Sequence, residues 1–356
     1  MTWSRLWEFY LRESSLALLI LGNVVFGVAA LGLALVAVAL RISNDAKAGH
    51  WARLEKLWEP LSLEVVVGLT PPDRLWALVG RKDRLRFVNY LLRFAKRVSG
   101  SERRIVDELA APYLDLLLPQ LSRRTPERRA RAVQTLSTLG SRRYMNVILR
   151  SLDDPSPLVA MVAARALART GTPEYAAGIL SRMHRFDQWR PSFLASMLAT
   201  MGPAVAPALR TALADPGYPL SVRGVAADAL RELHDYVSAD AAAKVLNEST
   251  DRNLIAATLN LMSHVGRVEH LPAIRRHAAS PQAIVRARAI AALGHVGAAE
   301  DLPFLVGAFH DDSAWVVLRA GEALLEAGAT DKLEALARLE TPRAEMAQQL
   351  LAGKPA

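Results

Sequence analysis

The sequence predicts an all-α protein with a single N-terminal transmembrane helix followed by an α-solenoid of repeated helix pairs. Three observations support this fold class. Residues Leu16 to Leu40 contain no charged side chain. Glycines recur every 31 residues over much of the chain. Hydrophobic residues make up 51% of the chain and aromatic residues only 6%, which is typical of helices that pack through small and branched side chains.

The uncharged segment is long enough to cross a membrane. As a helix it would extend about 37 Å, more than the roughly 30 Å of a hydrocarbon core. A secretory signal has an apolar core of only about 7–15 residues, so we interpret residues 16–41 as a transmembrane helix after a short non-cytoplasmic tail, residues 1–15. Arg5 and Arg12 precede the helix and many more basic residues follow it, which places the large C-terminal part in the cytoplasm.

Small residues line one face of this predicted helix, together with one amide. They are Asn23, Gly27, Ala30, Ala34 and Ala37. In lipid, small residues let two helices approach closely and an Asn can donate a hydrogen bond across the contact. The stripe therefore predicts a face for a partner's transmembrane helix, either a copy of this chain or another membrane protein. The alternative is that Ala and Gly are common in such helices and the stripe binds nothing.

Residues 42–80 are predicted to form a juxtamembrane amphipathic or linker segment. Four apolar residues fall on one face of a helix here: Trp51, Leu54, Trp58 and Leu61. A helix of this kind beside a span often lies in the membrane interface. The predicted membrane-interface residues are Trp3, Trp7, Trp51 and Trp58. The alternative is that this helix is the first core helix of the soluble part.

Positive charge is concentrated in residues 81–150, which hold 17 Lys or Arg and 6 Asp or Glu. Residues 81–118 are predicted to be a degenerate helical pair. An anionic lipid surface is the expected partner of this basic part, with nucleic acid or an acidic protein face as alternatives. The predicted basic face consists of Arg123, Arg124, Arg128, Arg129, Arg131, Arg142 and Arg143.

Residues 119–340 are predicted to hold about seven repeats of 31 residues. The marker glycines are Gly140, Gly171, Gly202, Gly266, Gly297 and Gly328, and one is replaced near Leu233. In each unit a turn with Asp or Pro precedes an Ala-rich helix, the glycine ends that helix in left-handed geometry, and a shorter helix follows. One unit cannot bury its apolar face alone, so stacking supplies the core. Residues 341–356 are predicted to be a C-terminal cap and tail.

Two units carry the clearest motif. One has Asp215, Pro216, Val222, Arg223, Ala226, Ala227, Ala229 and Leu230, and another has Pro281, Val285, Arg286, Ala289, Ala292, Leu293 and Gly294. On these residues the repeat resembles the HEAT family, in particular the short repeats of bacterial phycobilisome-lyase-type proteins. The Arg position is filled in three units only, by Arg129, Arg223 and Arg286, so a continuous Asp–Arg ladder is not expected.

The order of one span, a Trp-bearing segment and then such repeats resembles a narrower group of bacterial membrane-anchored HEAT-repeat proteins. Members of that group are often encoded beside membrane glycosyltransferases. The resemblance implies a single-pass protein of the bacterial inner membrane whose partner is a glycosyltransferase or a complex for polysaccharide synthesis or secretion. The resemblance to the phycobilisome-lyase-type repeats also implies an alternative function, that of a lyase or chaperone for tetrapyrrole proteins.

No catalytic motif is present in the sequence. A GxSxG elbow, a P-loop and an HExxH motif are absent, and the chain has no Cys, which excludes thiolate metal sites and a cysteine nucleophile. We therefore expect a non-enzymatic protein without catalytic, cofactor-binding or metal-binding residues. His264 and His295 occupy the same place in two repeats and should be neighbours. Asp153-Asp154 and Asp311-Asp312 precede Ala-rich helices and are expected to cap them.

Two tryptophans stand out among the Ala- and Leu-rich repeats. Trp189 lies beside Arg190 in the least regular unit, and Trp315 lies near the start of an Ala-rich helix. A large aromatic side chain on a solenoid either fills the core or is a hot spot for a partner. Trp189, Arg190 and Trp315 are the candidate partner hot spots.

The favoured function is a non-enzymatic, membrane-anchored scaffold or adaptor that binds a membrane protein through its transmembrane helix and its solenoid. The first alternative is a basic HEAT-repeat protein that binds or repairs nucleic acid. The predicted anchor argues against it, as does the absence of aromatic residues among the arginines of the basic face. The tetrapyrrole lyase or chaperone ranks last because the chain has no Cys. Self-association through the transmembrane helix is a further interaction to test.

Overall fold

The computed structural model describes residues 3–297, 299–339 and 343–353; side chains are described from residue 21 onward, except at positions 22, 44, 46, 47, 141 and 142. The described chain is about 80% helical and contains no strand. It divides into two compact units, Met1–Leu109 and Ala110–Ala356. The predicted all-α class and the solenoid are confirmed.

The N-terminal unit is dominated by one long helix, α1 (Trp3–Val67). This helix contains the predicted span and continues without a break through residues 42–67, so this part of the predicted juxtamembrane segment is helical. The helix ends at Gly68, which has a φ of +84°, and the amide of Leu69 donates to the carbonyl of Glu64 over 2.8 Å. Shorter helices follow: α2 (Pro72–Ala77), α3 (Arg84–Phe94) and α4 (Gly100–Leu114), whose last residues belong to the second unit.

An aromatic cluster joins the C-terminal part of α1 to α3. Trp58 is fully buried, and its ring lies edge-on to Phe87, with 5.1 Å between the ring centroids, and tilted against Tyr90 at 5.7 Å. Two ion pairs flank the cluster: Arg93 pairs with Glu55, and Arg97 Nη1 lies 3.5 Å from Glu59 Oε1. The prediction that Trp58 lies at the membrane interface is wrong, because this face of α1 packs in the core of the unit.

The second unit contains seven helix pairs between Pro126 and Ala337. Their first helices are α5 (Pro126–Leu139), α7 (Pro157–Ala168), α9 (Pro191–Ala199), α11 (Leu220–Glu232), α13 (Arg252–Val265), α15 (Ala283–Val296) and α17 (Ala314–Glu326). Their second helices are α6 (Met145–Arg150), α8 (Glu174–Leu180), α10 (Ala206–Ala214), α12 (Ala239–Glu248), α14 (Leu271–Ala278), α16 (Leu302–Ala308) and α18 (Thr330–Ala337). A single helix, α19 (Ala344–Ala352), follows the last pair.

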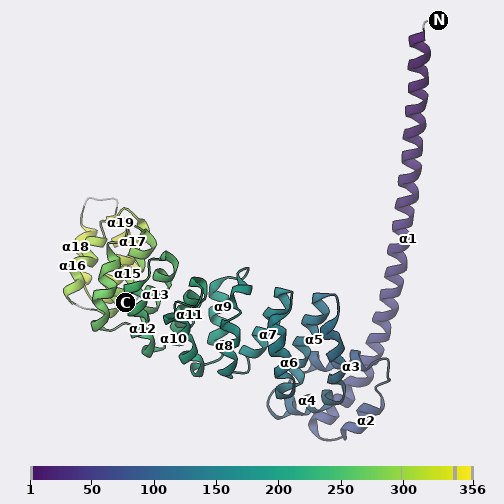
Figure 1. The fold of residues 1–356 in the computed structure, drawn as a ribbon, viewed down its shortest axis with the longest axis horizontal. Helices are drawn as coiled ribbons and strands as arrows, with labels where there is room; N and C mark the ends of the chain where they lie inside the picture. Colours follow the sequence, from purple (N-terminus) through teal and green to yellow (C-terminus); the bar gives the residue numbers. More distant parts are fainter. Residues whose placement is uncertain (1–2, 298, 340–342, 354–356) are drawn as a thin grey trace. The chain divides into compact units, whose positions relative to one another are not determined.

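The first helices lie side by side and form one layer of the solenoid (Figure 1). Most second helices, namely α6, α10, α12, α14 and α16, pack mainly against the first helix of the following pair. Small residues make this spacing close: Ala160, Ala163 and Ala164 on α7 are fully buried. Gly294 on α15 is the extreme case, since a Cβ there would lie 2.3 Å from Cβ and 2.7 Å from Cα of Ala323 on α17. Stacking of neighbouring repeats therefore supplies the core, as the repeat pattern predicts.

The marker glycines have two different roles. Four of them have positive φ as predicted: Gly171, Gly202, Gly297 and Gly328. Gly140 and Gly266 do not, with φ of −100° and −62°. At these two positions close contact excludes a side chain, because a Cβ would lie 2.4 Å from the Tyr144 ring or 2.5 Å from the Met262 carbonyl oxygen. Where the marker is replaced, His234 takes the left-handed conformation, with a φ of +51°.

Among the described residues, one helix is long and apolar enough to span a membrane, and it is α1. Helices α9 and α10 pass the same test only when joined across a bend of 107°. Their apolar residues Leu194, Leu198, Leu209 and Leu213 are buried within the solenoid, so their composition reflects packing.

Candidate partner-binding surfaces

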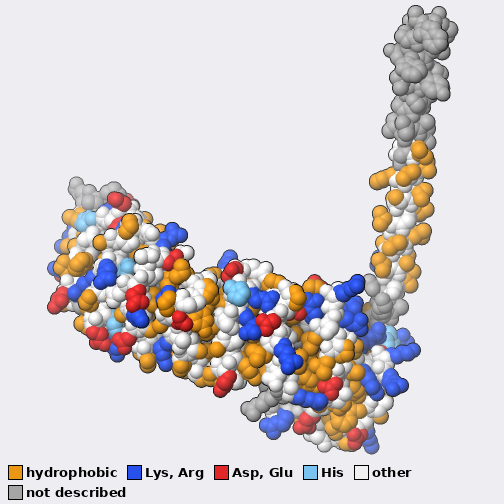
Figure 2. All heavy atoms as spheres, viewed as in Figure 1, with side chains coloured by type: hydrophobic (Ala, Val, Ile, Leu, Met, Phe, Trp, Pro, Cys, Tyr) orange, Lys and Arg blue, Asp and Glu red, His pale blue; other side chains and the backbone are white. Residues whose placement is uncertain are grey.

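The apolar part of α1 has no cover from the rest of the described chain. Its most apolar window has a mean hydropathy of 2.4 and none of it is buried. Phe26 is 75% exposed and Leu33 is 71% exposed. Figure 2 shows hydrophobic side chains along this part of the helix, without a Lys, Arg, Asp or Glu among them. An apolar surface of this length is unfavourable in water and calls for lipid or protein around it.

The predicted stripe lies on this uncovered surface. Asn23, Gly27, Ala30, Ala34 and Ala37 are all exposed. No described atom would lie within 4 Å of a Cβ at Gly27, so the backbone here is accessible to close approach by another helix. Binding of a partner at this face stays a prediction.

The predicted membrane-interface residues differ from one another in the structure. The side chains of Trp3 and Trp7 lie outside the described residues. Trp51 is half-buried, and the guanidinium carbon of Arg93 lies 4.8 Å from the centroid of its ring, a cation–π contact. Trp58 lies in the core. Of the predicted interface tryptophans whose side chains the structure describes, this leaves Trp51, and its contact with the membrane interface stays a prediction.

The predicted basic face is mostly exposed. Its exposed members are Arg123, Arg124, Arg128, Arg131 and Arg143. Arg143 Nη2 lies 3.0 Å from Asp115 Oδ2, with 65% of its side chain exposed, so this contact leaves it accessible. The side chain of Arg142 lies outside the described residues. Binding of lipid by this face is untested and stays a prediction.

Arg129 does not belong to this accessible set. Its Nε and Nη2 donate to the two carboxylate oxygens of Asp154 at 2.8 Å each, and its Nη1 donates to the carbonyls of Arg123 and Arg124. Arg286 makes the same contacts with Asp311 and with the carbonyls of Ser280 and Pro281. The prediction of a binding role for Arg129 is wrong, because this arginine joins one repeat to the turn of the next.

The acidic partners of these arginines also order the turns before the helices. Asp154 accepts the amide of Ser156, and Asp311 accepts the amide of Ser313, at 2.8 Å each. These bonds reach the residue before each helix, and neither α7 nor α17 has a side-chain hydrogen bond at its N-cap. The prediction that these aspartates cap the helices is therefore wrong, because their carboxylates bind the arginines and the preceding turns instead. Burial opposes the charged form of Asp154, but the bonds from Arg129 and Ser156 outweigh it and lower the pKa of its carboxyl group.

Three histidines from consecutive repeats form a row at the C-terminal ends of α11, α13 and α15. The rings of His264 and His295 are stacked with 6.0 Å between their centroids, and His234 lies edge-on to His264 at 6.4 Å. The predicted neighbours His264 and His295 are thus confirmed, and His234 extends the row. His264 Nδ1 lies 3.1 Å from the carbonyl oxygen of Asn260. Among the residues that the structure describes, no group of three His, Cys, Asp or Glu is placed to hold a metal ion.

We expect the solenoid to lose stability as the pH falls through about 6.5. Burial lowers the pKa of His264 from its ordinary 6.5, against the hydrogen bond with Asn260, and the nearby charges of Arg231, His295 and His234 lower it further. As the pH falls, the unfolded chain therefore binds this proton at a higher pH than the folded chain does. The free energy of unfolding decreases as the pH drops from 6.5 to the lowered pKa of the folded state. Thermal unfolding of wild type and His264→Gln at pH 7.5 and 5.5 checks this. A variant with the wild-type pH dependence would contradict it.

The candidate hot spots also separate into two kinds. Trp189 is half-buried and packs edge-on against the buried Phe186, with 5.9 Å between the ring centroids. Arg190 is exposed and stands directly before α9. Trp315 is 66% exposed, the most exposed aromatic side chain of the described repeats. Trp315 therefore has the accessibility of a partner contact, whereas Trp189 is partly a packing residue.

Trp315 forms one wall of a groove on the first-helix layer. The groove has a volume of about 460 Å³ and lies between α15 and α17. It is lined by Ala283, Ile284, Ala287, Arg288, Ser313, Trp315 and Arg319. We call it the first-helix groove. It combines a wide apolar wall with two arginines.

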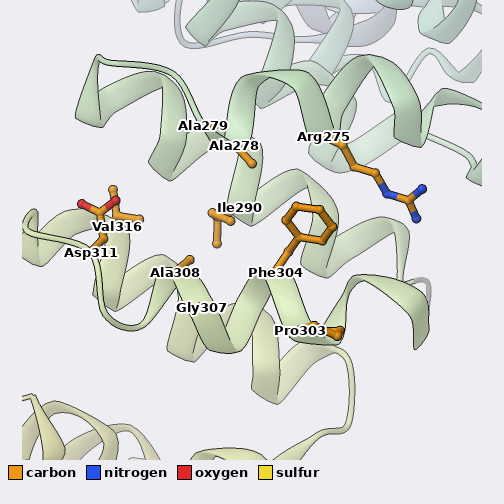
Figure 3. A pocket seen from close by; sticks show the side chains of 10 residues that line it. All are labelled: Arg275, Ala278, Ala279, Ile290, Pro303, Phe304, Gly307, Ala308, Asp311 and Val316. Atoms are coloured by element: carbon orange, nitrogen blue, oxygen red, sulfur yellow. The ribbon is translucent and has the colours of Figure 1, made fainter.

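A second groove of about 450 Å³ lies between α14 and α16, on the other layer. Figure 3 shows Ile290 and Phe304 near its centre, with Ala278, Gly307 and Ala308 around them and Arg275 pointing away. Phe304 is 50% exposed. Arg275 is paired with the fully buried Asp301, its Nε 2.6 Å from the Oδ1 atom. This groove is mainly apolar, and its two charged lining residues, Arg275 and Asp311, are each held in an ion pair.

The comparison with known families identifies the repeat. A family model for HEAT repeats matches residues 114–191 and 239–326. The second unit is a HEAT-repeat solenoid. The matched segments contain helix pairs of the described architecture, including the Arg129–Asp154 and Arg286–Asp311 contacts between adjacent HEAT repeats.

Solved structures with a similar arrangement of helices share little sequence with the chain. Kap121p bound to Ste12p is 13% identical, with a TM-score of 0.47 over 82% of this chain and 38% of that chain. The complex of CpcE and CpcF of phycocyanin lyase from Nostoc sp. PCC7120 is 19% identical, with a TM-score of 0.33 over 67% and 86%. Human deoxyhypusine hydroxylase in complex with glycerol is 17% identical, with a TM-score of 0.31 over 77% and 98%.

The chain spans less than half the length of the Kap121p chain that it matches. At these identities the likeness concerns the fold alone. No curated protein sequence matches the chain.

Sequence reasoning missed the two arginines of the first-helix groove and Phe304 of the second. A signal for the first was present. Ile284 and Trp315 are one repeat of 31 residues apart, and so are Arg288 and Arg319. Equivalent positions in adjacent HEAT repeats lie side by side, so an apolar pair and a basic pair at this interval predict one shared surface.

Proposed function

We propose that this protein is a non-enzymatic scaffold, anchored in the bacterial inner membrane by α1, whose HEAT repeats bind a protein partner in the cytoplasm. The observation that carries the proposal is the uncovered apolar surface of α1, which continues in one helix into the core around Trp58. Lipid or a partner's transmembrane helix is the natural environment of such a surface. Residues 16–41 are the proposed span, with residues 1–15 outside the cytoplasm.

The proposed partner is a membrane protein with a cytoplasmic part. The stripe from Asn23 to Ala37 would contact its transmembrane helices, and the HEAT repeats would contact its cytoplasmic part through exposed large side chains such as Trp315 and Phe304. A membrane glycosyltransferase, or a complex for polysaccharide synthesis or secretion, is the partner that the sequence resemblance implies. Binding of self through the same stripe is the competing arrangement.

The basic face would add a contact with lipid. Arg123, Arg124, Arg128 and Arg131 are exposed, and a basic side chain near an anionic membrane surface contributes about 1 kcal/mol. This contribution is reduced by salt, because the charges are screened. The contact would orient the first HEAT repeats at the membrane.

Co-purification in a gentle detergent tests the proposal. We expect tagged full-length protein to bring down a stoichiometric membrane protein, and the variant Asn23→Leu, Gly27→Leu, Ala30→Leu to lose most of it. The matched control is Val25→Leu, Ala29→Leu, Gly32→Leu, which changes the opposite face of the same helix and also removes one glycine. The control should keep the partner.

Each failure has its own meaning. Protein that comes out alone, in the wild type and in both variants, would contradict binding through the stripe. A complex that contains only this chain would replace the partner by a second copy. Equal loss in the stripe variant and in the control would mean that bulk in the helix, rather than a specific face, is responsible.

A further inference from the structure

The first-helix groove has walls of two kinds. Ile284 on α15 and Trp315 on α17 form the apolar part and are 47% and 66% exposed. The side chains of Arg288 and Arg319, one turn further along the same two helices, form the basic part. Single exposed apolar side chains are normal on a protein surface, but here two of them adjoin one groove together with two arginines.

The basic part has room for a carboxylate. Arg288 donates from Nη1 to the Asn260 side-chain oxygen at 2.9 Å, and among the described residues no carboxylate lies within ion-pair distance of its guanidinium. Burial lowers the pKa of Arg288, and so do the charges of Arg319 and Arg231, against the opposite effect of Asp228. The positive charge here is therefore only partly compensated, which favours a bound anion.

Arg319 has a partner that a ligand could replace. Its Nη1 lies 2.6 Å from Glu322 Oε2, but both side chains are about one third exposed. An ion pair with this exposure contributes little, so exchange of Glu322 for another carboxylate costs little. A planar guanidinium can then bind the carboxylate through two parallel hydrogen bonds.

We infer that the first-helix groove binds an acidic segment of a partner protein, with a bulky apolar side chain against Ile284 and Trp315 and a neighbouring carboxylate on Arg288 and Arg319. Trp and Arg are the side chains that most often dominate binding at protein interfaces. A single-stranded nucleic acid would stack a base on Trp315, whereas the aliphatic Ile284 beside it favours an apolar side chain of a protein. The second groove between α14 and α16 has its two charged lining residues, Arg275 and Asp311, held in ion pairs and is not assigned a ligand.

This inference rests on the proposed function for its setting, since it names the chemistry of the cytoplasmic segment that a scaffold would hold. Its test does not need that partner. A random library of 12-residue peptides displayed on phage is selected on full-length protein in detergent micelles. We expect enriched peptides to place Asp or Glu within three residues of Leu, Ile, Met, Phe or Trp.

A fluorescein-labelled synthetic peptide of the most enriched sequence then measures the contribution of each wall by fluorescence anisotropy. We expect Trp315→Ala to weaken binding at least tenfold, and the double variant Arg288→Gln, Arg319→Gln to weaken it similarly and to reduce its salt dependence. The matched control is Phe193→Ala, an exposed aromatic near the start of α9 that lies outside the groove and is 37% exposed. It should change the affinity less than twofold.

Three results would overturn the inference: no enriched peptide, enriched peptides that are basic, or binding that is insensitive to Trp315→Ala and to the arginine variant. Thermal unfolding of each variant separates loss of the site from loss of the fold. Because the selection uses detergent-solubilised protein without its membrane partner, failure of the co-purification leaves this result unaffected, and the two claims fail separately.

Discussion

Trp58→Ala is expected to lower the free energy of unfolding of the N-terminal unit by about 3–5 kcal/mol, the cost of removing a fully buried large aromatic side chain. The substitution removes the ring that packs on Phe87 and Tyr90 and leaves a cavity between α1 and α3. Amide hydrogen exchange over α3 in the detergent-solubilised protein measures the change, because α3 is held to α1 by this cluster.

The control for this prediction is Trp51→Ala, seven residues earlier on the same helix. Trp51 is half-buried and contacts Trp58 edge-on at 6.4 Å between centroids, so we expect a loss of at most about 1 kcal/mol. If Trp58 were at the membrane interface instead, Trp58→Ala would weaken membrane attachment and leave exchange in α3 unchanged. That result would contradict the core assignment.

Gly294→Ala is expected to destabilise the solenoid by about 1–3 kcal/mol, although alanine favours helix. The new Cβ would lie 2.3 Å from Cβ and 2.7 Å from Cα of Ala323. The second atom belongs to the backbone, so α15 and α17 must move apart and lose packing between two repeats. The gain in helix propensity is only about 1 kcal/mol, which is not enough to offset this loss.

Gly307→Ala is the matched control, with the opposite expected sign. Gly307 is an exposed glycine within α16, and no described atom would lie within 4 Å of a Cβ there. We expect it to stabilise the protein by about 0.5–1 kcal/mol through helix propensity and a less flexible unfolded chain. Thermal unfolding of both variants beside wild type is sufficient. A stabilising Gly294→Ala would show that the two repeats are less tightly packed than the structure indicates.

The helices and the repeats were predictable because their signals are local or periodic. The uncharged run from Leu16 to Leu40 and the 31-residue spacing of glycines need no tertiary information. Trp58 was not predictable in the same way. A stripe of apolar residues at helical spacing is the same for a membrane surface and for a core, and the residues that decide, Phe87 and Tyr90, lie about 30 positions further on.

The site residues show the same difference between features that the sequence reveals locally and features that depend on packing. Trp315 stands out by residue type alone, and its exposure agrees with the prediction of an accessible hot spot. Arg129 stands in a run of arginines that looks like a binding face, but its partner Asp154 belongs to the next repeat. Likewise, Gly140 carries the repeat's marker without left-handed geometry, because what it needs is room for the Tyr144 ring. Packing contacts decide these roles, one repeat away for Arg129 and four residues away for Gly140, and composition does not reveal them.

The central claim is that α1 crosses a membrane and holds the HEAT repeats on its cytoplasmic side. The chain has no cysteine, so single cysteines introduced by Ser4→Cys and Ser221→Cys report on the two sides without background. Spheroplasts are labelled with a membrane-impermeant maleimide, before and after lysis, and the membranes are washed at alkaline pH. We predict that the protein stays in the membrane pellet, that position 4 is labelled before lysis, and that position 221 is labelled only after it. Protein released by the alkaline wash, or position 221 labelled before lysis, would contradict the claim.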